Sequence, residues 1–147
     1  NYRLRALGGR IALAGDMPAR YYARSSFGKL WRQYRQYGFW KVRVLQKHPR
    51  QMRWRQFVPG AFVGSLAAVT LAVPALGKRP LAALVGAYLA ANGAATVLTL
   101  RQKPAAKKRE LAPRLALAFA LQHVGYGVGF VAGLVRFARG FLPHRRR

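Results

Sequence analysis

Three long runs without a charged residue constrain this chain more than any other feature. They cover residues 57–77, 81–100 and 115–135, which are 21, 20 and 21 residues long. A helix needs about 20 apolar residues to cross the hydrocarbon core of a bilayer, where it satisfies its own backbone hydrogen bonds. The alternative is three buried helices of a soluble bundle, but these runs lack the polar face that such helices need. We therefore expect an integral membrane protein, mainly α-helical, with about three transmembrane helices.

The connections between these runs predict how the spans follow one another. Lys78, Arg79 and Pro80 form a tight turn between the first two, so residues 57–100 should be an antiparallel transmembrane hairpin. Residues 101–114 hold six basic residues and two prolines, and we expect a basic cytoplasmic loop there. Residues 115–147 then supply a third membrane segment and a basic tail.

The distribution of Lys and Arg predicts the orientation, because cytoplasmic loops carry an excess of both. If the N-terminal part and residues 101–114 are cytoplasmic, 20 basic residues lie inside and 7 lie outside. Arg145, Arg146 and Arg147 are then on the outer side, against the rule. The third segment therefore either spans the membrane or is re-entrant or interfacial.

The chain is strongly basic as well as apolar. It has 27 Lys and Arg residues and a net charge of +25, and its acidic residues are Asp16 and Glu110. Such an imbalance indicates an anionic partner: nucleic acid, a lipid surface or a phosphorylated substrate. The sequence has no Cys, which excludes disulfides, thiolate nucleophiles and Cys-ligated metals. Two carboxylates so far apart also argue against a metal site.

The first 56 residues divide into two parts. Residues 1–24 suggest a short αββ unit, the tail end of a larger domain. A helix that Gly8 and Gly9 stop is followed by strands at 10–13 and 19–23 around a turn at Gly15 and Asp16. Residues 25–56 form the second part, a basic interface segment.

Residues 27–47 have the pattern of a basic amphipathic helix. Apolar and aromatic residues recur every three or four positions, while Lys and Arg fill the other side. Ser25 or Ser26 is the expected N-cap, and His48 ends the pattern before a proline. A core helix of a soluble domain has the same pattern, but the first uncharged run begins at residue 57. We therefore expect this helix at the headgroup level, with Trp54 and Phe57 in an aromatic belt.

Several short runs carry a family resemblance. They are NYRLR (1–5), GGRI (8–11), YARSS (22–26), LWRQY (30–34), YGFWK (37–41) and HVGYGVG (123–129). In this order they resemble the part after the catalytic acid in bacterial family-two glycosyltransferases, especially the succinoglycan-biosynthesis type. In that family the acidic motif with the general base immediately precedes the match to residues 1–5. The resemblance covers most of the chain and implies a location in the bacterial cytoplasmic (inner) membrane.

The family's Gln-x-x-Arg-aromatic motif falls on the run QYRQY. The resemblance implies that Gln33 and Tyr37 line the acceptor side and help to hold the donor diphosphate, with Trp40 also placing the acceptor. Gln36 stands where the family has Arg, so Arg35 is the substitute, although one residue along a helix turns a side chain by about 100°. The alternative for Gln33 and Tyr37 is ordinary helix packing.

Sugar transfer from a nucleotide sugar is the chemistry that the resemblance implies. It needs a diphosphate bound to Mg²⁺ or Mn²⁺ and a base for the acceptor. Asp16 and Glu110 supply neither, so we expect no catalytic residue, metal or cofactor in this chain, which alone should be inert. Its expected function is the membrane anchor and interface module of such an enzyme, with a lipid-linked or polysaccharide acceptor. The expected partners are membrane lipids, anionic headgroups or polyprenyl diphosphate.

Two other functions compete with this one. The first is a non-catalytic structural subunit of a larger bacterial membrane complex, derived from such a glycosyltransferase and bound to other membrane subunits. The codons upstream of Asn1 would discriminate between the two. The second is nucleic-acid binding, since aromatic residues alternate with Arg between Trp31 and Trp40. Three membrane spans argue against it, so no nucleic-acid partner is expected.

Two features of the membrane segments remain. His123 is ionisable at membrane depth, where it is a candidate for a functional role, a metal ligand or a hydrogen bond between helices. We favour interhelical packing. Gly125, Gly129 and Gly133 share one helix face and permit close helix approach. Gly86, Ala90 and Ala94 repeat this pattern in the second run.

Overall fold

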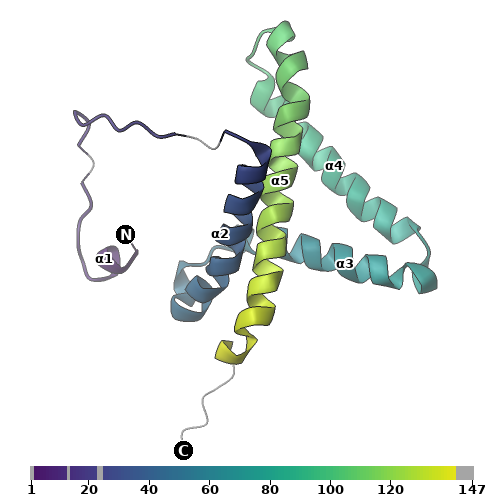
Figure 1. Cartoon of the computed structure of the whole chain (residues 1–147), viewed down its shortest axis with the longest axis horizontal. Helices are drawn as coiled ribbons and strands as arrows, with labels where there is room; N and C mark the ends of the chain where they lie inside the picture. The colour runs from purple at the N-terminus through teal and green to yellow at the C-terminus, as the bar shows by residue number, and fades with distance from the viewer. Residues whose placement is uncertain (1, 13, 23–24, 142–147) are drawn as a thin grey trace, which may run out of the picture.

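The computed structural model describes residues 2–12, 14–22 and 25–141, and these ranges are mainly helical (Figure 1). The helices are α1 (Tyr2–Ala6), α2 (Phe27–Lys47), α3 (Val58–Leu76), α4 (Arg79–Leu100) and α5 (Ala105–Phe137). Short 3-10 turns lie at Pro49–Gln51, Trp54–Gln56 and Ala138–Phe141. The expectation of three helices long and apolar enough to cross a membrane is confirmed for α3, α4 and α5.

Residues at the ends of these helices explain where they begin and stop. Ser26 is the N-cap of α2, and its hydroxyl accepts a hydrogen bond from the backbone N–H of Lys29 at 3.3 Å. Prolines stand in the first turns of α3 and α4, where the missing N–H would have no helical partner. Gly77 ends α3 with a φ of +72°, a conformation that favours glycine.

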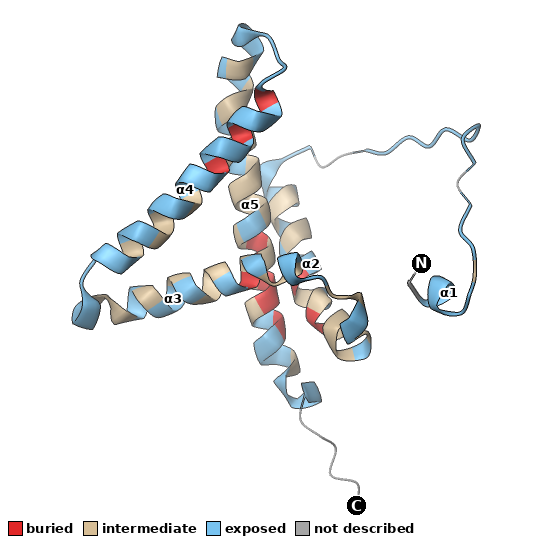
Figure 2. Cartoon of the chain, turned by 180° about the vertical axis from the view of Figure 1, so that it is seen from behind, coloured by how far each residue is buried: buried red, intermediate tan, exposed pale blue. Residues whose placement is uncertain are grey.

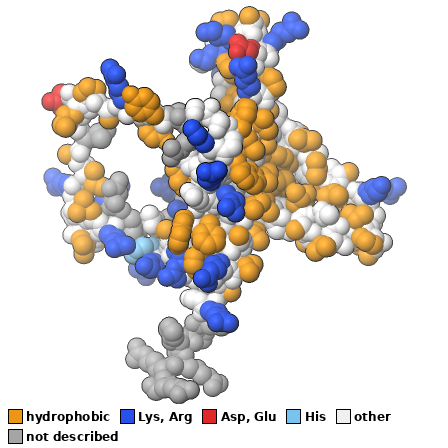
Figure 3. All heavy atoms as spheres, viewed as in Figure 1, with side chains coloured by type: hydrophobic (Ala, Val, Ile, Leu, Met, Phe, Trp, Pro, Cys, Tyr) orange, Lys and Arg blue, Asp and Glu red, His pale blue; other side chains and the backbone are white. Residues whose placement is uncertain are grey.

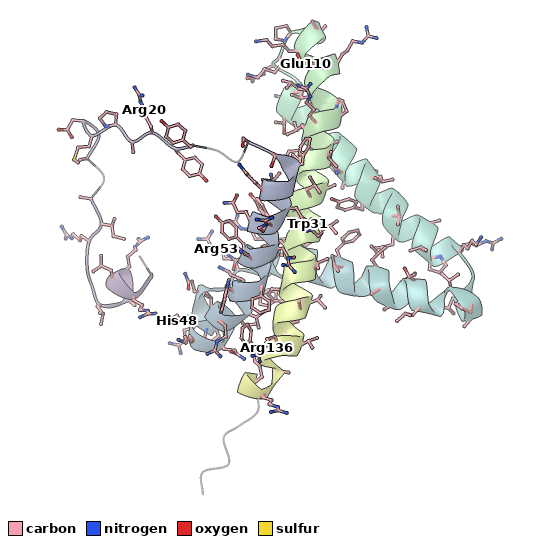
Figure 4. The ribbon with its side chains drawn as sticks, in the orientation of Figure 1. Arg20, Trp31, His48, Arg53, Glu110 and Arg136 are labelled. Atoms are coloured by element: carbon pink, nitrogen blue, oxygen red, sulfur yellow. The ribbon has the colours of Figure 1, made fainter. Side chains whose placement is uncertain are left out.

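α2 and α5 lie side by side and run in the same direction, with Trp31 between them (Figures 1 and 4). Val42 of α2 has no exposed surface at this contact, and the Gln46 side chain donates a hydrogen bond of 2.7 Å to the Phe137 carbonyl. The facing pairs are Trp31 and Gly125, Arg35 and Gly129, and Phe39 and Gly133, each 94 residues apart in the sequence. This constant register means that the two helices stay in contact through most of α2.

α3 and α4 diverge from their shared turn like the arms of a V, and each returns to α5 at its other end (Figure 2). At the start of α3, Gly60 packs against the ring of Phe130. In the second half of α4, Asn92 and Thr96 are buried, and the Asn92 amide donates a hydrogen bond of 3.1 Å to the Ala116 carbonyl. The predicted hairpin is therefore present, but its arms are splayed and contact α5 more than each other.

The expected loop at 101–114 is mostly helix. α5 begins at Ala105 and continues through Pro113, so the connection to α4 is only a turn of a few residues after Leu100. Pro104 is the N-cap of α5. The run that follows contains alanines, lysines and a leucine, which are good helix formers, and this local preference outweighs the loop signal from the prolines.

The N-terminal part corrects a second expectation. The helix stopped by glycine is confirmed as α1, with Gly8 at a φ of +80°. The two strands are wrong, because the described parts of 10–13 and 19–23 contain no strand; Leu13 and Ala23 lie outside the described residues. These segments form an exposed arm away from the helices (Figure 1). Two short strands without a packed face are marginal in water, so the alternating pattern alone does not make a sheet.

Candidate functional site

One face of α2 packs against α5, and another remains open. Gly38 and Val42 are buried at the contact, whereas 53% of Tyr37 and 59% of Trp40 are exposed. Gln33 shares the open face, and its amide donates a hydrogen bond of 2.6 Å to the Tyr37 hydroxyl one helical turn away. The structure therefore brings together three of the predicted site residues, Gln33, Tyr37 and Trp40, on one side of α2, where the Trp40 ring also lies 6.0 Å from the Phe137 ring of α5.

Trp40 and Tyr37 line a hollow of about 460 Å³ between α2, the turn before α3, and α5. Lys41 brings a positive charge to its wall, and Tyr126 brings an aromatic ring from α5. The Tyr126 hydroxyl is buried and has no hydrogen-bond partner among the described residues. The lining residues are Gln36, Tyr37, Trp40, Lys41, Val44, Gln56 and Tyr126. A mostly apolar hollow with one cation suits an amphiphile that has an anionic end.

Gln56 is positioned by its own turn. Its side-chain carbonyl oxygen accepts a hydrogen bond of 3.2 Å from the Arg53 backbone N–H, which holds the side chain at the start of α3. Gln56 and Tyr126 also line an adjoining hollow of about 280 Å³ that reaches Arg55 and His123. A second cation, Arg55, therefore lies one hollow away from Lys41.

Arg35 does not share the hollow of Trp40. Its side chain lines a separate cavity of about 180 Å³ with Phe39 and Gly129, on another side of α2. Gln36, at the family's Arg position, does line the hollow of Trp40. Arg35 and Lys41 therefore line different cavities, and the cation beside Trp40 is Lys41.

Lys41 and Tyr126 are the residues that sequence reasoning missed. Lys41 is the last residue of the run YGFWK and follows Trp40 directly, so this run could have indicated Lys41 as a site residue. Tyr126 reaches the hollow only because α5 packs along α2, and no local pattern predicts that contact.

His123 is exposed but reaches α4, as the interhelical interpretation predicts. Its Nδ1 atom is 3.4 Å from the Tyr88 hydroxyl of α4, and its ring stacks on Phe119 at 6.5 Å between centroids. Tyr88 in turn stacks on Phe62 of α3 at 4.5 Å. This aromatic group links all three long helices.

The three glycines of α5 face α2 rather than lipid. A side chain at Gly125 would lie 3.0 Å from the Trp31 ring, and one at Gly133 would lie 2.7 Å from the Phe39 carbonyl oxygen. At Gly129 it would overlap the carbonyl of Arg35. In α4 the related stripe is open, since a side chain at Gly86 would meet nothing within 4 Å.

The two acidic residues are far from this site and from each other. Glu110 accepts a hydrogen bond of 2.8 Å from Arg114 near the start of α5, and Asp16 lies in the exposed arm (Figure 3). Among the described residues, no three His, Asp or Glu side chains are grouped to hold a metal ion.

The fold defines a mainly helical protein with three helices able to cross a membrane, which is consistent with a multi-pass membrane protein. Comparison with protein-family models, with curated proteins and with solved structures finds no match to this chain.

Proposed function

We propose that this chain is the membrane anchor and interface module of a bacterial family-two glycosyltransferase in the inner membrane. Its acceptor would be a sugar linked to a polyprenyl diphosphate or a growing polysaccharide. The ordered sequence runs that resemble this family support the proposal. In this proposal the donor site, the metal and the base for catalysis come from another part of the enzyme.

The observation that carries the proposal is the hollow lined by Trp40, Lys41 and Tyr126. Aromatic rings give an apolar surface that suits a sugar face or a prenyl chain, and Lys is a good point charge for a phosphate. The Tyr126 side chain adds a further aromatic ring to this wall. The hollow thus offers both an apolar wall and an anion-binding group within one site.

Binding of a fluorescent polyprenyl diphosphate to the chain in nanodiscs tests this proposal. We expect tighter binding than for the polyprenol of the same length. Lys41→Gln and Trp40→Ala should each weaken binding of the diphosphate by about tenfold, the effect of losing one good contact.

Two matched controls remove a lysine charge and a tryptophan ring that lie outside the hollow. Lys47→Gln changes an exposed Lys on the same helix, and Trp54→Ala removes a ring that is 80% exposed. Both should bind the diphosphate as the parent does. Equal binding of diphosphate and polyprenol, or equal losses in the controls, would contradict the proposal.

A structural subunit of a larger membrane complex is the second candidate. Its supporting observation is the open small-residue surface of α3 and α4, where a side chain at Gly64, Gly86 or Gly93 would meet nothing within 4 Å. Such surfaces allow another helix to approach closely. Substituting Leu at these glycines should then abolish association with the partner subunits while leaving the diphosphate measurement unchanged.

A further inference from the structure

We infer that α2 and α5 lie as a pair along one face of the membrane, and that only the hairpin of α3 and α4 crosses it. The inference concerns the lipid surface that this fold fits, and it does not depend on the glycosyltransferase proposal. It rests on the register between α2 and α5, the places where the hairpin touches α5, and the positions of the charges.

The register between α2 and α5 is the first observation. The middle of the uncharged run in α5 is Gly125, which faces Trp31. If α5 crossed the bilayer with this run in the core, α2 would lie beside it at the same depth. At about 1.5 Å per residue, Lys29, Arg32 and Arg35 would then fall within about 6 Å of the bilayer midplane.

Those three side chains are exposed in the described structure, and the ion pair that it shows, Glu110 with Arg114, lies elsewhere. Charged side chains at the bilayer centre are rare, and they normally face a bundle interior or a water-filled cavity. Exposed cations on α2 would instead meet acyl chains. A transmembrane α5 and its observed contact with α2 are therefore incompatible, whereas an α5 lying along the membrane face keeps these cations among the headgroups.

The contacts of the hairpin give the second observation. If α3 and α4 each cross once, the ends opposite their shared turn lie at the same membrane face. α5 touches α3 near this end, where Phe130 meets Gly60. On α4 the Ala116 carbonyl meets Asn92, eight residues before the end at Leu100. α5 therefore closes the open side of the V and is parallel to neither arm, so it does not cross in the direction of α3 or α4 (Figure 2).

The surface chemistry agrees with this arrangement. α3 and α4 are apolar and mostly exposed, with Leu71 at 83% and Val97 at 68% exposure, as expected for helices that meet lipid. Among the described residues, Lys78 and Arg79 lie at the turn of the hairpin, and the other charged side chains lie on α2, in the turns after α2 and after α4, towards the ends of α5 and in the arm (Figure 3). Arg53 likewise lies on the α2 side of α5, away from that turn (Figure 4).

This topology also removes the conflict between the basic C-terminal residues and the positive-inside rule. With α5 along one face, the chain after α5 stays on the same side as the chain before α3. Arg145–Arg147 therefore no longer have to be placed on the outer side. The basic residues other than those of the turn then share one face, as the positive-inside rule requires.

The absence of Cys from the sequence makes a direct test simple. Single cysteines would replace Ala106 near the start of α5, Ala138 just after its end, and Lys78 at the turn of the hairpin, all of which are exposed positions. Each variant of the full chain would be labelled with a membrane-impermeant maleimide in spheroplasts and in inverted membrane vesicles. The Cys-free parent measures background, and labelling in detergent shows that each thiol can react.

We expect Ala106→Cys and Ala138→Cys to react from the same side and Lys78→Cys from the other. Reaction of Ala106→Cys and Ala138→Cys from opposite sides would overturn the inference, because α5 would then cross the membrane. Reaction of all three from one side would overturn the crossing of the hairpin.

A reporter fused to the C-terminus of the unsubstituted chain gives an independent reading. Green fluorescent protein should fluoresce there and alkaline phosphatase should be inactive, as for a cytoplasmic end. The opposite pattern would contradict the inference without relying on any variant.

Discussion

The α2–α5 pair and the α3–α4 hairpin contain similar residues, but these residues pack against a neighbouring helix in the pair and are largely open in the hairpin. Both α4 and α5 are rich in glycine, alanine and aliphatic residues. In α5 the backbone and side chains of α2 fill the space beside Gly125, Gly129 and Gly133, and α3 fills it beside Gly127, whereas Gly86 and Gly93 of α4 meet open space. Composition therefore does not say which helix packs; a neighbour of matching shape decides it.

The largest effect on stability should come from adding a side chain at a packed glycine of α5, compared with the same change at an open glycine of α4. In Gly129→Leu the new atoms would overlap the Arg35 carbonyl, so the helices must separate. We expect a loss of about 3 kcal/mol or more, roughly 10 °C in the melting temperature in detergent. Gly86→Leu, with open space around it, should leave the melting temperature unchanged or slightly raised.

Thermal unfolding of both variants against the parent measures this contrast. Equal melting temperatures for Gly129→Leu and the parent would show that the α5 glycines face lipid. A large loss in Gly86→Leu would show instead that α4 packs against a further chain in the purified protein.

A smaller effect is expected from shortening one aliphatic side chain in the α2–α5 pair and one in the α3–α4 hairpin. Val42 is completely buried between α2 and α5, so Val42→Ala leaves a cavity and should cost about 2 kcal/mol. Leu71 is 83% exposed on α3, and Leu71→Ala should change stability very little if lipid surrounds it. Denaturant titration of the two variants separates them, and an equal loss for both would remove the distinction between a packed and a lipid-facing helix.

The smallest effect concerns the hydrogen bond of the Asn92 side chain, one of the polar contacts between α4 and α5. Asn92→Leu keeps the volume but removes the hydrogen bond to the Ala116 carbonyl, with an expected loss of about 0.6 kcal/mol. Thr99→Val is the control, because its hydroxyl bonds the Ala95 carbonyl within α4 itself. A loss in Thr99→Val as large as in Asn92→Leu would mean that the bond between helices has no special role.

Much of the secondary structure could be predicted from the sequence. The uncharged runs predict three apolar helices, and the periodicity of residues 27–47 predicts α2 with correct ends, because its N-cap and its terminating proline are local signals. The strands of the arm were predicted from equally local alternation and did not form. A strand needs a second strand as its hydrogen-bonding partner, whereas a helix bonds within itself. An alternating pattern therefore predicts a strand less reliably than a helical period predicts a helix.

The candidate site was predictable only in part. Gln33, Tyr37 and Trp40 share a face because the helical period puts them there, and the sequence alone is sufficient for that. Lys41 and Tyr126 join Trp40 in one hollow through the contact of α2 with α5, which joins segments some 90 residues apart. The loop predicted at 101–114 was wrong, because the good helix formers in this stretch outweigh the two prolines.

The sequence by itself determined that residues 27–47 and the three uncharged runs are helical, and that these runs are apolar enough to enter a membrane. Backbone groups in lipid must be satisfied within each segment, so the requirement is local and can be read from the chain. Only the tertiary structure decided that the glycines of α5 face α2, and that the hairpin opens into a V. These outcomes depend on shape matching between distant segments, for which no local pattern carries the information.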